Sequence, residues 1–160
     1  MAQRAQALAD RLIQGADALA AFAKTMNDAE WKKSGSPDRR PFGVIVHHVA
    51  SVYPLEIQLA QTLGSGKPIA GVTWGAVHEM NAKHAADHKA VSRAETLELL
   101  QQNSRTAAGA VRALTDAQLD SAAPVSLNAD APLTCQFMIE DHALRHSYHH
   151  LAKIRAALGR

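Results

Sequence analysis

The chain has 160 residues, 47% of them hydrophobic and only 4% aromatic, and a formal net charge of +2 with neutral histidines. This length fits one domain over residues 1–160, and so weak a charge gives no reason to expect nucleic acid as a partner. No apolar run is long enough for a membrane span. The single cysteine, Cys135, excludes an internal disulfide and a cysteine-based zinc motif. A reducing cytoplasm is therefore expected.

The first expected helix covers residues 2–28. Its apolar residues recur at steps of three, four and seven, which is typical of one face of a helix: Leu8, Leu12, Leu19, Phe22 and Met26. The charges of Asp10, Arg11 and Asp17 interrupt this alanine-rich stretch. We therefore expect a helix that stays in the mature protein, not a signal peptide. A polar loop is predicted over residues 31–40.

The second expected helix begins near Pro41, because proline is favoured in the first turn of a helix. Its apolar face consists of Ile45, Val49, Val52, Leu59 and Leu63. Pro54 lies inside this pattern and is expected to kink or divide the helix. Residues 64–71 should end it.

Two further helices are expected in the middle of the chain. Thr73 is a candidate N-cap for the first of them, whose inner face would carry Asn81, His84 and His88. The next opens with Ser92 and Glu95, which have the spacing of a capping box.

The pair Thr115 and Gln118 repeats the capping-box spacing and predicts a short extra turn. Residues 121–132 are predicted to form a loop, and residues 133–158 a long final helix. Apart from a brief stretch at residues 125–127, no alternation typical of strands is found. The pattern as a whole predicts an all-α fold, an up-and-down four-helix bundle with an additional short helix.

Nine histidines are unusual in a chain of this length, and their spacing points to a metal site. On the last helix His146 and His150 are one turn apart within an apolar face, the arrangement that lets two imidazoles share one ion. His142 extends the series backwards, but one ion can use either 142 and 146 or 146 and 150. His149 points toward a flank.

A third ligand must come from another helix. His48 projects near the apolar face of the second segment, whereas His47 is turned about 100° away. We therefore favour His48. Glu56 lies two turns further along nearly the same face and is a weaker candidate, either as a fourth ligand or as a buried polar partner.

Plainer interpretations apply to the other histidines. His84 and His88 also have i, i+4 spacing, but they could form a polar flank of their helix. Asn81 and His84 could line a pocket or be hydrogen-bonded residues inside the bundle. The spacing assigns no role to His78.

Two stretches carry a resemblance to a known family. The strings from Val46 to Ala50 (VHHVA) and from His146 to Ile154 (HSYHHLAKI) resemble the DinB-like superfamily of four-helix bundles, many of them metal-dependent enzymes. The family pattern has one metal histidine on the second helix and an H-x3-H pair on the last. The resemblance thus implies that His48, His146 and His150 hold one divalent ion. Family members often have glycine and glutamine after the final histidine, where this chain has Ala152 and Lys153.

The resemblance and the ligand set together suggest an enzyme. Three nitrogen ligands favour zinc or nickel and leave coordination positions open for chemistry. Some family members are thiol-dependent, so we expect an S-transferase or isomerase that acts on a small molecule with a low-molecular-weight thiol. The alternatives are a non-catalytic metal- or ligand-binding stress-response protein and a helical interaction module whose histidines only pack.

The last helix has a second apolar face, opposite the histidines. It is formed by Phe137, Leu144, Tyr148 and Leu151. A helix that is apolar on two sides must be buried on both. This favours a homodimer, unless the first helix covers that face.

Overall fold

The computed structural model describes residues 3–35 and 39–160. The helices are α1 (Gln3–Thr25), α2 (Asp28–Lys32), α3 (Phe42–Gly64), α4 (Trp74–Asp87), α5 (Arg93–Arg112), α6 (Asp116–Asp120), α7 (Cys135–Met138) and α8 (Arg145–Leu158). A π-helical segment, Ile139–Leu144, joins α7 to α8. Strands β1 (Ala122–Val125) and β2 (Ala131–Thr134) flank a 3-10 turn, Ser126–Asn128. In the described part of the chain, no helix combines the length and the apolar character that crossing a membrane requires.

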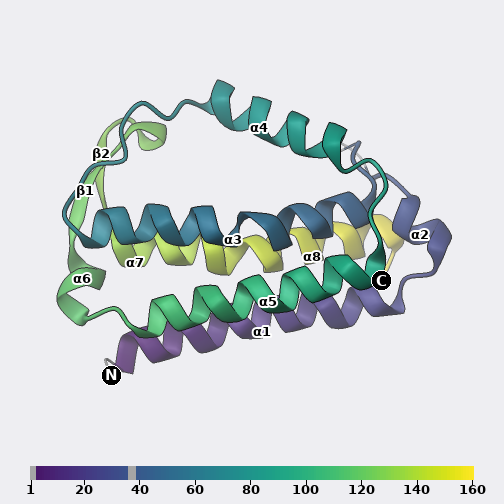
Figure 1. The fold of residues 1–160 in the computed structure, drawn as a ribbon, viewed down its shortest axis with the longest axis horizontal. Helices are drawn as coiled ribbons and strands as arrows, with labels where there is room; N and C mark the ends of the chain where they lie inside the picture. Colours follow the sequence, from purple (N-terminus) through teal and green to yellow (C-terminus); the bar gives the residue numbers. More distant parts are fainter. Residues whose placement is uncertain (1–2, 36–38) are drawn as a thin grey trace.

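The core is a four-helix bundle made by α1, α3, α5 and the last helical stretch (Figure 1). Helix α1 packs against α5 and α8, and α3 packs against α5 and the α7–α8 stretch, so the order around the bundle is α1, α5, α3, α8. The all-α bundle predicted from the sequence is confirmed. Its helices do not alternate throughout, however, because α3 and α5 run in the same direction (Figure 1).

Helix α4 makes this parallel arrangement possible by carrying the chain back along the outside of the bundle (Figure 1). None of its residues is buried, and Trp74 at its start is 56% exposed. The segment with the weakest apolar face is therefore a crossover outside the bundle.

The predicted helix starts are confirmed where capping residues indicated them. The side chains of Thr73 and Ser92 accept hydrogen bonds from the backbone of the first turns of α4 and α5. Thr115 and Gln118 form the complete capping box at α6. Each such cap satisfies a backbone N–H that the helix itself leaves without a partner.

Two predicted loops were wrong in part. Residue Trp31, expected in a loop, belongs to α2, which is started by a capping box on Asn27. Residues 121–132 and their neighbours form an antiparallel hairpin in which Ala123 pairs with Leu133. Ile69 adds backbone hydrogen bonds to this hairpin, with its N–H donating to Pro124 and its carbonyl accepting from Ser126. Those bonds come from a distant segment, so local sequence patterns do not reveal them.

The start of α3 is fixed by a close contact with α2. A Cβ on Gly43 would lie 2.8 Å from Cζ2 of Trp31, so only glycine lets the indole pack there. The indole Nε1 donates a 3.0 Å hydrogen bond to the carbonyl of Val91, just before α5. Helix α3 then continues past Pro54 as one element, so it is not divided there.

The second apolar face of the last helix lies partly against α1. The ring of Tyr148 packs on Gly15, where a Cβ would be only 2.7 Å from Cε2. Leu144 and Leu151 are partly buried against the core, whereas Phe137 and Tyr148 are about 40% exposed. Helix α1 thus covers part of this face, and the homodimer stays a prediction.

Candidate metal centre

The structure brings His48, His146 and His150 together between α3 and α8. One ligand nitrogen from each residue lies within 4.8 Å of the other two, so the group could hold a metal ion. The ring centroids of His146 and His150 are 4.9 Å apart, and that of His48 is 5.1 Å from His146. We call these three residues the first cluster. His48 and His150 are buried, and His146 is partly exposed.

Glu56 orients one ring of the first cluster. Its Oε1 lies 2.7 Å from Nδ1 of His146, which donates the hydrogen bond when the ring carries its proton there. This leaves Nε2 of His146 available to bind a metal ion. Carboxylate–histidine pairs of this kind fix the ring and raise its basicity in metal sites. This contact is the one expected of Glu56 as a buried polar partner, and its role as a fourth ligand stays a prediction.

Within the first cluster, the surroundings of His48 favour its neutral imidazole. Burial, then the positive charges of His146 and Arg40, lower the pKa of His48 to about 2. Its Nδ1 is buried and makes no hydrogen bond with protein groups. An uncharged imidazole is the form that binds a metal, and a buried nitrogen without a partner is costly unless something else binds it. The residues present therefore fit a cation.

A second link between α3 and α8 adjoins the first cluster. The hydroxyls of Tyr53 and Ser147 form a 2.7 Å hydrogen bond, and both residues are buried. Burial raises the pKa of Tyr53, so the phenol stays protonated. Since Ser147 follows His146 directly, this bond helps to fix the position of the histidine pair on α8.

Two neighbouring histidines stay outside the first cluster. His142 lies in the π-helical segment and faces Asp141, with Nε2 3.8 Å from a carboxylate oxygen. The wider π turn removes the α-helical i, i+4 relationship between His142 and His146. His149 is half-buried, and its ring centroid lies 5.2 Å from that of His150.

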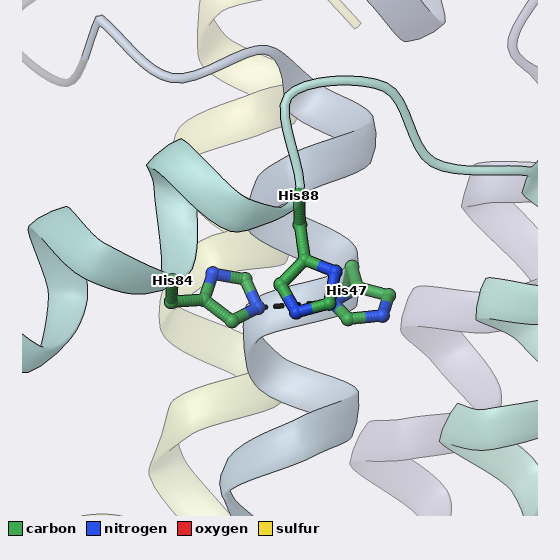
Figure 2. A group of neighbouring side chains, drawn as sticks. All are labelled: His47, His84 and His88. Atoms are coloured by element: carbon green, nitrogen blue, oxygen red, sulfur yellow. Dashed lines mark hydrogen bonds between the residues drawn. The ribbon is translucent and has the colours of Figure 1, made fainter.

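A second group of imidazoles consists of His47, His84 and His88, which we call the second cluster. Figure 2 shows His84 and His88 directed from α4 and its C-cap toward His47 on α3. The distance between Nδ1 of His47 and Nε2 of His84 is 2.9 Å, a hydrogen bond. One ligand nitrogen from each of the three residues again lies within 4.8 Å of the others. The sequence showed the His84–His88 spacing but not that His47 would complete the group.

Of the further candidates Glu56, Asn81 and His84, each of which could line a pocket at the site, two adjoin the first cluster. Glu56 bonds to His146, and the ring centroid of His84 is 5.4 Å from that of His48. Asn81 is half-buried on α4. Tyr53 and Ser147 were missed, because a tyrosine and a serine on two helices carry no spacing signal that would pair them.

Comparison with known proteins agrees with this fold. A solved structure similar to the chain is YfiT from Bacillus subtilis, described as "a probable metal-dependent hydrolase with an unusual four-helix bundle topology". The match has a TM-score of 0.75 and 16% sequence identity, and it covers 99% of this chain and 90% of that one. No curated protein matches the chain. The family model of the DinB superfamily matches residues 11–154, and the chain therefore belongs to that superfamily.

Proposed function

We propose that the protein is a divalent-metal-dependent enzyme whose ion is bound by His48, His146 and His150. The observation that carries this proposal is the convergence of three imidazoles from two helices, with Glu56 bonded to one of them. Three protein ligands leave at least one position for a reacting group, whereas structural zinc sites are usually closed by four. Zinc and nickel are the ions that we expect for three nitrogen ligands.

The reaction that we propose is attack of an activated nucleophile on a small electrophilic substrate. A divalent ion would lower the pKa of a water or thiol bound to it. The residues around the ion would hold its ligands in place. Glu56 fixes the ring of His146. The hydrogen bond between Tyr53 and Ser147 fixes the backbone of α8. The description of YfiT as a probable metal-dependent hydrolase supports water as the nucleophile.

Thiol-dependent transfer or isomerisation is the second candidate. It rests on the family resemblance of the histidine strings, and the same open positions would accept a thiolate. Cys135 is not the nucleophile in this proposal. Its side chain is fully buried in α7, and burial raises the pKa of the thiol to about 11. A free, low-molecular-weight thiol would be required.

The test is turnover by protein loaded with zinc or nickel. Activated esters and phosphoesters probe hydrolysis. Glutathione, mycothiol or bacillithiol, combined with maleylpyruvate, epoxides or halogenated compounds, probe thiol transfer. We expect metal-dependent turnover that Cys135→Ser retains and His146→Ala loses. If neither panel gives a metal-dependent rate above background, a non-catalytic metal-binding protein, such as a stress-response protein, becomes the better interpretation.

A further inference from the structure

The second cluster shares no residue with the first and joins the external helix α4 to the bundle. We propose that His47, His84 and His88 form a second divalent-metal site, and that an ion bound there fastens α4 onto α3. This inference does not depend on the proposed catalytic function.

The geometry of the second cluster is at least as close as that of the first. The ring centroids of His47 and His88 are 4.2 Å apart, and those of His84 and His88 are 4.7 Å apart. In the first cluster the distance between His48 and His150 reaches 6.0 Å. A tetrahedral zinc ion with Zn–N bonds of about 2.0–2.1 Å needs its nitrogens about 3.4 Å apart. Small rotations of these half-exposed side chains would satisfy this.

The ligands come from a favourable backbone arrangement. His84 is in the last turn of α4 and His88 is its C-cap, so the two rings are one turn apart on the same side. The hydrogen bond between His47 and His84 shows that the third ring already faces this pair (Figure 2). The carboxylate of Asp87, ion-paired with Lys83, adds negative charge near His84 and His88, which partly offsets the charge of Arg40.

The two clusters would bind separate ions. His47 and His48 are adjacent on α3 and point about 100° apart, so they cannot both serve one ion. Two-metal centres usually place their ions about 3.5–4 Å apart and share ligands. The six histidines here divide into two complete sets of three, with no shared member.

An ion in the second cluster would hold α4 against the bundle, which the packing of its side chains does only weakly. This helix has no buried residue, so side-chain burial contributes little to its position. Binding would hold His84 in place, and with it the side of the first cluster that faces α4, since the rings of His84 and His48 are 5.4 Å apart. The side chains of α4 that lie next to the first cluster would then be more ordered.

The test is zinc stoichiometry, measured by equilibrium dialysis and elemental analysis of untagged protein. Wild type should bind two ions per chain. His84→Ala and His88→Ala should each bind one, and so should His146→Ala, because it keeps the second cluster. His78→Ala is the matched control, since His78 is an exposed histidine on α4 outside both clusters, and it should bind two. Circular dichroism checks that each variant keeps its helices.

Amide hydrogen exchange supplies a second measurement. Zinc should slow exchange along α4 in His146→Ala, where only the second site remains, and should not do so in His88→Ala. The inference is overturned if His84→Ala and His88→Ala both keep two ions. It is also overturned if wild type binds a single ion that His146→Ala loses and His88→Ala keeps. If wild type binds a single ion that His88→Ala loses and His146→Ala keeps, the result would support the second site and contradict the ligand set of the first.

Discussion

Glu56 Oε1 and His146 Nδ1 lie 2.7 Å apart across the interface of α3 and α8. Both groups are mostly buried, with side-chain exposures of 9% and 19%. The contact has two consequences. It sets the orientation of one imidazole in the first cluster, and it provides a polar link between two bundle helices beside the proposed ion.

Replacing this carboxylate should weaken metal binding without removing a ligand. We expect Glu56→Gln to lower zinc affinity at the first site by about 10–100-fold, the usual cost of losing such an outer partner of a metal histidine. Competition with a chromophoric chelator in the His88→Ala background would measure this. Glu98→Gln, at an exposed position on α5, is the matched control and should bind normally. If Glu56→Gln binds zinc with unchanged affinity, the hydrogen bond from His146 to Glu56 has no effect on His146 as a metal ligand.

The proposed ligands of the first site should differ from their neighbours on the same helix. His146→Ala should abolish tight binding at that site, and His48→Ala and His150→Ala should weaken it strongly. His142→Ala should have little effect, because His142 faces Asp141 and lies outside the cluster. Isothermal titration with zinc in the His88→Ala background isolates the first site. Full occupancy after His146→Ala would contradict the assignment.

The sequence alone was enough to predict that His146 and His150 lie side by side on one helix, and to predict where most helices begin. Both features depend on the spacing of residues that are close in the chain. His146 and His150 are one turn apart in any α-helix, and Thr115 with Gln118 can cap only a helix that begins between them. The choice of His48 over His47 needed only the direction of the apolar face of α3. That face is confirmed by the burial of Ile45 and Val49.

The remaining features depend on tertiary contacts that spacing cannot reveal. The hairpin at residues 122–134 contains Pro124 and Pro132, which weaken any strand signal, and it is supported by Ile69 from a distant loop. Helix α4 has a periodic pattern but lies outside the bundle, so its histidines meet His47 only because the chain crosses over α3. The π turn before His146 also has no recognised sequence signal.

The contact between α2 and α3 should be sensitive to a single methyl group. Gly43→Ala would drive a Cβ into the indole of Trp31, and we expect it to destabilise the protein by about 1–3 kcal/mol, as overpacked cores usually do. Gly109→Ala is the matched control on α5, because nothing outside the local helix backbone lies within 4 Å of its added Cβ. Alanine is the better helix former, so this control should be up to about 1 kcal/mol more stable. Urea unfolding of both variants measures the difference, and equal stabilities would contradict the packing argument.

The lowered pKa values of His48 and His84 should make the metal-free protein sensitive to acid. In the unfolded chain a histidine titrates near pH 6.5. The folded protein lowers the pKa of His48 to about 2, through burial and then the charges of His146, Arg40, His150 and His84. It also lowers the pKa of His84 to about 4, first through burial and then through His47 and His88. Below about pH 6.5 the unfolded state therefore binds protons that the folded state does not.

Stability should thus be fully present above pH 6.5 and fall as the pH drops toward 4. For a buried group such as His48, the free energy of unfolding should fall by up to about 1.4 kcal/mol per pH unit in this range. The effect at the more exposed His84 should be smaller because of solvent screening.

Urea unfolding in the presence of a chelator, at several pH values, gives the slope of the free energy of unfolding against pH. His48→Leu should make the slope shallower by nearly one proton, whereas His78→Leu, at an exposed position, should change it little. A slope that His48→Leu leaves unchanged would mean that His48 is not held neutral in the folded state.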